Sequence, residues 1–582
     1  MTIDFLNKKI EKSINDLYNV DIPSNVCQIN KTKSDFEGDF TLIIFPFLSF
    51  SKTDLLTTAN EIANILKDFD EIDSFNIVKG FLNLNLSDGF LSNLFKTAVE
   101  SKNYGFLSSK SNSETTLVEF SSPNTNKPLH LGHIRNNLIG FAISNIFKAC
   151  GHNVKMVQVI NDRGIHICKS MLAWLKYGNG KTPASEKVKG DFFVGQYYIL
   201  FEKKLKEEIN KIGDKNIIPN ILIEAQEMLV KWENKDPEII KLWNMMNNWV
   251  YEGMDITYKK LGIVFDKNYY ESDTYLDGKR IVNEFLDKNI FFSKEDNSVW
   301  VDLSKYNLDE KLLLRSDGTA VYMTQDIGTA FSRYKDFNFD NMIYVTGNEQ
   351  NYHFQTLFKI LEKLSCHWAK KCFHLSYGMV DLPTGKMKSR EGTVVDADDL
   401  IDKMRNDSFN LIKKSNKFDD FNDEEIKDLS NIVGDGALKY FILKVDSKKN
   451  IMFNPEDSID FNGNTAPFIQ YTYARINSVL SKKKDFKNCY NSFEEMGSVE
   501  KALIKIIIEF PNCIKQCKES LNPAFLANYI YHLAKTYNKF YQKVPILDGS
   551  RNENFRLTIS KKVSLVIKNG MRLLGIDVPN RM

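Results

Sequence analysis

A strand, a loop, a helix and a second strand follow one another within about forty residues of this chain, and this order constrains its fold most. The apolar run Leu117–Phe120 predicts the first strand, and Ser121–Pro128 is rich in turn-forming residues. A helical pattern covers Leu131–Cys150, and Val154–Ile160 predicts the second strand. Such a βαβ unit requires a parallel sheet. Because parallel sheets bind ligands where a strand leads into a helix, the loop before Leu131 is a candidate site.

The 582 residues are enough for several domains of about 150 residues each. Short strands at Thr41–Phe47 and Phe81–Leu86 stand among helical patterns, which predicts an α+β domain at the N-terminus. A helix-rich stretch then interrupts the α/β pattern, and the chain ends in segments with apolar stripes at helical spacing. The strands predicted after the helix-rich stretch are Val299–Leu303, Leu312–Leu314 and Met342–Val345.

We therefore predict six consecutive parts. They are an N-terminal α+β domain (1–110), the first half of an α/β domain (111–184), a mostly helical insertion (185–295), the second half of the α/β domain (296–395), a connecting region (396–465) and a helical bundle (466–582).

The net charge of +2 conceals an uneven distribution. The segment Phe461–Met582 carries 19 Lys and Arg against 9 Asp and Glu, so its net charge is +10 and the other 460 residues carry −8. A basic segment of this kind suits an anionic partner such as nucleic acid, and a solvated helical surface is the alternative.

The first residues contain no apolar core of a signal peptide, and the most apolar run, Thr41–Phe50, is too short to span a membrane and contains Pro46. The eight Cys are scattered without a disulfide framework. We expect a cytoplasmic protein with no membrane partner.

Two histidines, His130 and His133, stand at the start of the predicted helix. A helix N-terminus offers free N–H groups and positive potential to phosphates, and imidazoles can add hydrogen-bond donors. Gly132 between them would let a ligand approach the backbone. The spacing alone leaves surface and metal-ligand roles open, but the glutamate of the zinc-metalloprotease pattern is absent. The strand–loop–helix context favours phosphate binding.

The run His130-Leu131-Gly132-His133 resembles the HIGH motif of class I aminoacyl-tRNA synthetases. The preceding run EFSSPN, from Glu119 to Asn124, is similar to the arginyl-tRNA synthetase version. The resemblance extends over nearly the whole chain in family order. It implies an α/β fold class: a Rossmann-like parallel-sheet catalytic domain with a helical insertion, an N-terminal α+β domain and a C-terminal α-helical anticodon-binding bundle.

A basic segment, Gly378–Val395, stands where that family has its KMSKS loop. Its lysines suit a loop that binds polyphosphate. Without the HIGH motif upstream, the same residues would equally fit a basic surface turn. Ser389 replaces the last lysine of KMSKS. In arginyl-tRNA synthetases that lack this lysine, a lysine just before HIGH is proposed to compensate for it, and Lys127 occupies that position here. The resemblance implies His130, His133, Lys127, Lys386 and Lys388 as catalytic residues, and ATP contacts from Pro123, Leu129, His130, Gly132, His133, Gly378, Met379, Val380, Lys386, Met387, Lys388, Ser389 and Arg390.

A guanidinium substrate requires carboxylates and planar acceptors. Tyr322 and Asp326 are four residues apart and share a face if the segment is helical. Taken alone, Asp326 also fits a helix N-cap and Gln350 an ordinary loop residue. The resemblance implies that Asp326 pairs with the guanidinium, that Tyr322 and Gln350 donate or accept hydrogen bonds, and that Glu119 braces its loop. It also implies contacts with the arginine substrate from Ser122, Asn124, His133, Glu271 and Glu119 itself.

The resemblance implies an arginine–tRNA ligase. The carboxylate of L-arginine would attack the α-phosphorus of ATP, and the arginyl group of the adenylate would pass to the 3′-terminal adenosine of tRNA(Arg). The enzyme would contribute positioning and charge stabilisation without a covalent nucleophile. Mg²⁺ is expected with ATP, although no metal-ligating residue is assigned, and the chain is expected to be a monomer.

The segment Ile469–Leu480 resembles the start of the family's anticodon-binding domain, and the first domain is implied to contact the outer corner of the tRNA. Residue types that stack on or hydrogen-bond to unpaired bases gather in this segment, with helix packing as the alternative. The tRNA contacts predicted here are Gln470, Tyr471, Tyr473 and Arg475.

Two other functions stay open at this stage. One is a class I synthetase for another amino acid, against which Asp326 and the EFSSPN run argue. The other is a tRNA-binding paralogue without catalysis, against which the intact His130, Gly132 and His133 argue.

Overall fold

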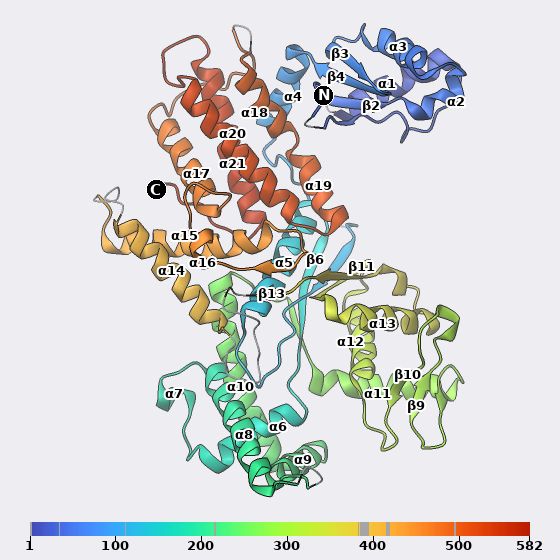
Figure 1. The fold of residues 1–582 in the computed structure, drawn as a ribbon, viewed down its shortest axis with the longest axis vertical. Coiled ribbons are helices and arrows are strands. Elements are labelled where there is room, and N and C mark those ends of the chain that lie inside the picture. Colours follow the sequence, from blue (N-terminus) through green and yellow to red (C-terminus); the bar gives the residue numbers. More distant parts are fainter. Residues whose placement is uncertain are drawn as a thin grey trace.

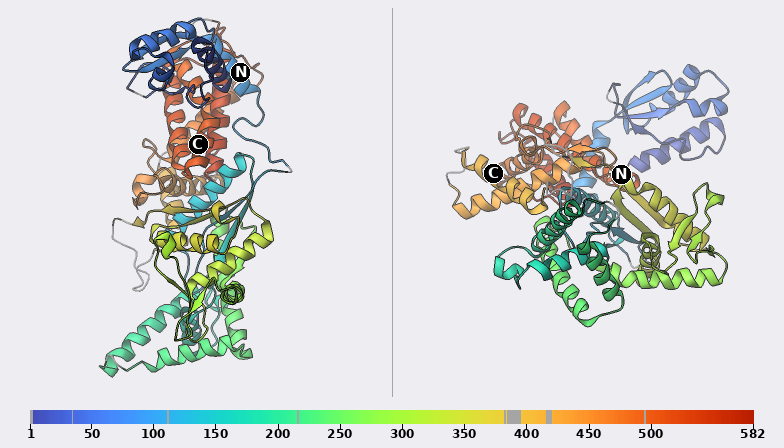
Figure 2. Two further views of the ribbon diagram at one scale, coloured as in Figure 1. Left: turned by 90° about the vertical axis from the view of Figure 1, so that its right-hand side faces the viewer. Right: turned by 60° about the horizontal axis from the view of Figure 1, so that its bottom comes forward.

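The protein is elongated, with its N-terminal domain beside the C-terminal bundle at one end and the helical insertion at the other (Figures 1 and 2). The structure is a computed structural model, and it describes residues 3–33, 35–110, 112–214, 217–381, 383, 395–414, 420–493 and 496–582. Among these residues, none of the helices is both long enough and apolar enough to cross a membrane.

The N-terminal domain is built on an antiparallel sheet with the strand order β1-β2-β4-β3. The predicted strand Phe81–Leu86 is confirmed, whereas the strand predicted at Thr41–Phe47 ends at Ile43. A 3-10 turn, Phe45–Phe47, follows because Pro46 cannot donate a ladder hydrogen bond. The elements are α1 (Ile3–Tyr18), β1 (Asn30–Lys31), β2 (Phe40–Ile43), α2 (Leu48–Ser51), α3 (Leu55–Leu66), β3 (Ile72–Val78), β4 (Phe81–Leu86) and α4 (Asp88–Glu100).

The central sheet is parallel with the strand order β12-β11-β5-β6-β7, which confirms the predicted βαβ unit. Both faces of the sheet are covered by helices. Leu117 on β5 packs into the hydrophobic cluster that includes α12 (Tyr322–Phe337) and α13, and its neighbour Val118 packs into the hydrophobic cluster that includes α5. The chain turns in opposite directions after β5 and β11, so a topological switch point lies between these strands. The elements are β5 (Thr115–Glu119), α5 (Leu131–Ala149), β6 (Asn153–Ile160), β7 (Lys267–Tyr270), β11 (Asn341–Gly347), α13 (Asn351–Lys363) and β12 (Cys372–Tyr377).

The helical insertion leaves the sheet after β6 and returns to it at β7, so it begins earlier and ends earlier than the predicted range 185–295. The strands predicted near Val299 and Leu312 exist, but they form a separate antiparallel sheet with the order β10-β9-β8. The elements are α6 (Ile165–Tyr177), α7 (Pro183–Glu186), α8 (Gly190–Ile212), α9 (Asn220–Glu233), α10 (Pro237–Leu261), α11 (Glu271–Asp287), β8 (Phe292–Ser293), β9 (Val299–Val301), β10 (Lys311–Leu314) and α12 (Tyr322–Phe337).

The C-terminal part is mostly helical, and its bundle lies beside the N-terminal domain (Figure 1). Tyr104, after the N-terminal domain, donates its hydroxyl to the carbonyl of Ile507 at 3.0 Å. The elements are β13 (Val380–Asp381), α14 (Ala397–Lys414), α15 (Asp423–Leu443), β14 (Ile451–Met452), α16 (Pro455–Ser458), α17 (Ala466–Ser481), α18 (Ser498–Ile508), α19 (Phe510–Ser520), α20 (Ala524–Lys543) and α21 (Glu553–Leu573).

Helices α11 and α12 pack backbone against backbone, because Gly278 and Gly328 face each other's helix. A Cβ atom at Gly278 would collide with the carbonyl oxygen of Thr324, and one at Gly328 would collide with that of Thr274. This close packing sets the position of the first turn of α12, which carries Tyr322.

We predict that Gly278→Ala lowers the free energy of unfolding by about 1–3 kcal/mol, because the two helices must separate. Urea denaturation followed by circular dichroism measures this change. Gly89→Ala is the matched control, since Gly89 lies in a helix with no atom near its would-be Cβ. Equal midpoints for Gly278→Ala and the wild type would contradict the close packing.

Candidate active site

The first motif forms the N-terminus of α5, as predicted. His130 is the N-cap residue, and its Nδ1 accepts a hydrogen bond from the backbone N–H of Gly132 at 3.1 Å. His133 returns the arrangement, because its Nδ1 accepts from the backbone N–H of His130 at 3.2 Å. A Cβ atom at Gly132 would lie 2.9 Å from the His130 ring, so the glycine makes room for the imidazole.

These hydrogen bonds determine where the protons of the two imidazoles lie. Each Nδ1 accepts, so each neutral ring carries its proton on Nε2 and can donate there. Burial, followed by the positive charge of Lys127, lowers the pKa of His130 to about 4. Burial, followed by the charges of His130 and Lys127, holds the pKa of His133 well below its ordinary value. Both histidines therefore act as neutral Nε2–H donors, with ring centroids 3.9 Å apart.

A cavity of about 490 Å³ opens in front of this helix end. Burial lowers the pKa of Lys127, which lines the cavity just before the motif. Residues from both halves of the catalytic domain and from the insertion share the wall, including Asn124, Lys127, His130, Glu271, Tyr322 and Asp396. The structure thus brings together residues from the two halves that the sequence predicted separately.

The loop between β5 and α5 is held in an unusual backbone conformation. Ser121 and Ser122 both have positive φ, at 72° and 46°. Glu119 stabilises this turn, because its Oε1 accepts from the hydroxyl of Ser122 at 2.8 Å, which is the predicted bracing. Its Oε2 accepts from Arg333 at 2.5 Å, and both partners are buried. The carboxylate of Glu119 is therefore neutralised within the protein.

The residues predicted to bind the arginine substrate lie on α12 and between β11 and α13. Tyr322 begins α12 and Asp326 lies one turn later, which confirms the shared face and places Asp326 within the helix instead of at its N-cap. Asp326 Oδ2 accepts from Nε2 of His353, on α13, at 2.5 Å. Gln350 is exposed at the N-cap of α13, and neither Asp326 nor Gln350 lines the cavity itself.

Glu271, at the start of α11, lines the cavity, and its predicted contact with the guanidinium stays a prediction. Burial raises its pKa to about 7, and the charge of Arg163 opposes this rise. Its Oε1 accepts from Gln325 at 2.5 Å and lies 3.8 Å from Arg163 Nη1. Arg163 also lies 4.1 Å from the ring centroid of Tyr275.

The predicted second motif is only partly described. Lys386, Met387, Lys388, Ser389 and Arg390 lie outside the described residues. The segment before them is fixed by Arg135 of α5, whose guanidinium donates to the carbonyls of Met379, Ser447 and Lys449 at 2.7, 3.0 and 2.7 Å. The backbone N–H of Gly378 donates to the carbonyl of Ser447 at 2.9 Å, and Val380 pairs with Ile451 of β14.

The predicted tRNA residues of α17 divide into two groups. Gln470 is fully buried and donates to the carbonyls of Ile432 and Asp577, and Tyr473 is 4% exposed. Neither can reach a base in this packing, so the prediction is corrected for these two. Tyr471 and Arg475 are half-buried, and the Arg475 guanidinium lies 4.8 Å from the Tyr471 ring.

Sequence reasoning missed Arg163 and His353. Arg163 follows directly on β6, at the carboxyl edge where parallel sheets bind ligands, so that rule could have identified it. His353 carries no such pattern, because only the packing of α13 beside α12 brings its ring to Asp326.

Two family models match the chain in order. The model described as tRNA synthetases class I (R), catalytic domain, covers residues 96–455, and the DALR anticodon binding domain covers residues 469–582.

Curated relatives and solved structures match over full length. A protein of Bacteroides thetaiotaomicron named arginine–tRNA ligase is 51% identical over 596 residues, which is 100% of this chain and 99% of that protein. One of Flavobacterium psychrophilum with the same name is 49% identical over 601 residues, with 100% and 99% coverage. The Thermus thermophilus arginyl-tRNA synthetase structure is similar in fold, with a TM-score of 0.81 at 22% identity and full coverage of both chains. From the full-length identity and the two ordered domain matches, the chain belongs to the arginine–tRNA ligase family of class I tRNA synthetases.

Proposed function

We propose that this arginine–tRNA ligase activates L-arginine in the cavity at the start of α5 and then transfers the arginyl group to tRNA. One observation carries the assignment of the site. On the wall of the cavity, Lys127 and His130, a neutral hydrogen-bond donor, lie at the start of α5, and the carboxyl group of Glu271 lies at the start of α11. ATP is an anion and arginine carries a guanidinium, so the two sides suit the two substrates.

On the ATP side, Nε2–H of His130 and His133 would donate to phosphate oxygens as charge develops at the α-phosphate. Neutral donors that are already oriented by backbone N–H groups need little reorganisation during the reaction. Lys127 would add a positive charge, together with Lys386 and Lys388 of the second motif. Mg²⁺ would accompany ATP and be held mainly by its phosphate oxygens.

On the arginine side, Asp326 would pair with the guanidinium, with Tyr322 and Gln350 beside it. His353 already donates to one oxygen of Asp326, and this contact orients the carboxylate plane for a planar partner. Ser122 and Asn124 would hold the α-amino and carboxylate groups in the turn braced by Glu119. The substrate carboxylate then faces the α-phosphate for in-line attack, with diphosphate as the leaving group.

The tRNA would lie along the bundle, with Tyr471 and Arg475 near the anticodon end, and the basic charge of residues 461–582 supports contact with phosphates. We also infer a cytoplasmic location, since reduced cysteines suit that compartment and all eight are free thiols in the structure. That the chain is a monomer stays a prediction from the family resemblance.

Aminoacylation of total tRNA with each of the labelled amino acids tests the function. We expect the purified protein to charge tRNA with arginine alone. Charging with another amino acid, or tRNA binding without any charging, would contradict the proposal.

We predict that Asp326→Asn raises the KM for arginine by about 10- to 100-fold, because one charge-assisted contact is lost. The KM for ATP should stay close to the wild-type value. Steady-state pyrophosphate exchange gives both constants. Asp317→Asn, at an exposed position before α12, is the matched control. If both KM values rose together, Asp326 would not be specific to arginine.

We predict that Lys127→Ala slows pyrophosphate exchange by about 10- to 100-fold, because a positive charge beside the phosphates is removed. Lys148→Ala, at an exposed position on the same helix as the HIGH motif, should leave the rate unchanged. An unchanged rate for Lys127→Ala would show that this lysine does not compensate for Ser389.

A further inference from the structure

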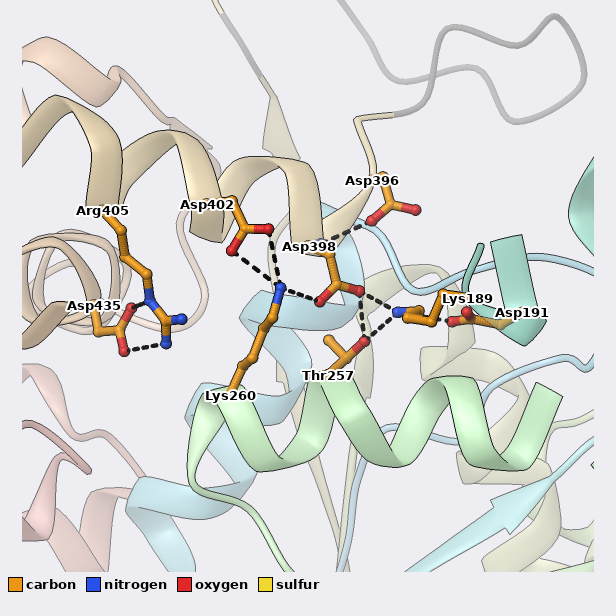
Figure 3. Close-up of polar contacts among 9 residues, drawn as sticks. All are labelled: Lys189, Asp191, Thr257, Lys260, Asp396, Asp398, Asp402, Arg405 and Asp435. Atoms are coloured by element: carbon orange, nitrogen blue, oxygen red, sulfur yellow. Dashed lines mark hydrogen bonds and ion pairs between the residues drawn. The ribbon is translucent and has the colours of Figure 1, made fainter. Parts of the chain in front are cut away.

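A cluster of charged side chains joins the helical insertion to helix α14, which begins shortly after the second motif. Figure 3 shows Lys189 at the start of α8 and Lys260 on α10 pointing toward Asp398 on the first turn of α14. The cluster lies next to the cavity, because Asp396, two residues before Asp398, is part of the cavity wall.

Lys189 is surrounded by three oxygen atoms. Its ammonium donates to the hydroxyl of Thr257 at 2.6 Å and to the carboxylate of Asp398, and it forms an ion pair with Asp191 at 3.1 Å. The Thr257 hydroxyl in turn donates to Asp398 Oδ2 at 2.7 Å. Two of the three N–H bonds of the ammonium are thus used in hydrogen bonds inside the protein, and its charge also faces Asp191.

The two carboxylates around Lys189 depend on its charge. Asp191 has no exposed surface, and the Asp398 side chain is only 15% exposed. Two carboxylates in such surroundings repel each other unless a cation lies between them. Lys260 supplies a second positive charge at 3.0 Å from Asp398 Oδ1, and it also binds Asp402 in the next turn of α14 (Figure 3).

The same turn of α14 is attached to the HIGH motif. The backbone N–H of Asp398 donates to Asp396 Oδ1 at 2.7 Å, which caps the helix. Asp396 pairs with His130 in an antiparallel bridge, and the backbone N–H of Ala397 donates to the carbonyl of Leu129 at 2.9 Å. A shift of Asp398 would therefore be passed through two residues to the backbone of His130.

Helix α8 also touches the other side of the motif. A Cβ atom at Gly195 would lie 2.9 Å from Pro128 Cδ and 3.5 Å from Lys127 Cα. This helix thus packs on the loop that leads into His130 and, through Lys189, holds the segment that pairs with His130.

We propose that Lys189 is a positioning residue for the ATP half of the reaction: by binding Asp398 and Asp191 it fixes residues 396–397 against Leu129 and His130. The inference rests on the proposed placement of ATP at His130. The residues proposed for the arginine guanidinium lie on α11, α12 and α13, and Ser122 and Asn124 are proposed for its α-amino and carboxylate groups. None of these residues belongs to the cluster, so Lys189 affects the binding of ATP more than that of arginine.

The test is pyrophosphate exchange by full-length Lys189→Met at varied ATP and varied arginine. We expect the KM for ATP to rise, or kcat to fall, by about tenfold, while the KM for arginine stays within about twofold. Lys189→Arg should recover most of the loss, because it keeps the charge. Lys413→Met is the matched control, since Lys413 lies at the far end of α14 and forms an exposed ion pair with Asp423 of α15.

A double-mutant cycle with Asp398→Asn tests the contact itself. If Lys189 acts through Asp398, the double variant loses no more than the worse single variant. Should Lys189→Met fail to fold, Lys260→Met removes the more exposed cation of the same carboxylate, and we expect the same KM pattern at a smaller size.

Two results would overturn the inference in a folded variant: unchanged kinetics, or equal increases in the KM values for ATP and arginine. His130→Ala, measured in parallel, separates this failure from that of the proposed site. If His130→Ala keeps full exchange activity, the placement of ATP is wrong; if it loses activity while Lys189→Met does not, only the role of Lys189 is wrong.

Discussion

The fully buried guanidinium of Arg135 is the interaction on which the architecture of the site depends. From one turn inside α5 it binds three carbonyl groups that belong to the segments around β13 and β14. Its neighbour Asn136 donates to the carbonyl of Val345 on β11 and accepts from the backbone of Ser121. Two consecutive residues thus tie the HIGH helix to the loop before it, to the sheet and to the strand that leads into the second motif.

Burial of charge explains much of the chemistry around this helix. Low solvation keeps His130 and His133 neutral, so they donate hydrogen bonds without carrying charge of their own. Glu119 is paired with Arg333, whereas Asp326 has a histidine beside it and stays near solvent. The carboxylates near the cavity therefore differ in availability: Glu119 serves the fold, and Asp326 keeps capacity for a cationic substrate.

Local patterns predicted most of the fold. The strands around α5 were found because apolar runs of that length are distinctive when both sheet faces are buried. Strand β7 has no distinctive pattern, because Lys267–Tyr270 is a short edge strand whose first two residues are polar and exposed. At the site, His130, Lys127, Glu271 and Tyr322 line one cavity, although they were singled out in separate motifs of the sequence. Contacts that depend on helix packing, such as His353 with Asp326, left no pattern in the sequence.

The sequence by itself determined the family, the order of the domains and the residue types available at the site, because motifs and apolar periodicity are local properties of a chain. Tertiary structure alone decided which of these residues are free to act. Glu119 is neutralised by Arg333, which is 214 residues away, and Gln470 is used by backbone carbonyls in the bundle. Solvation and ion pairing depend on neighbours that are distant in sequence, so protonation state and accessibility follow from the packing.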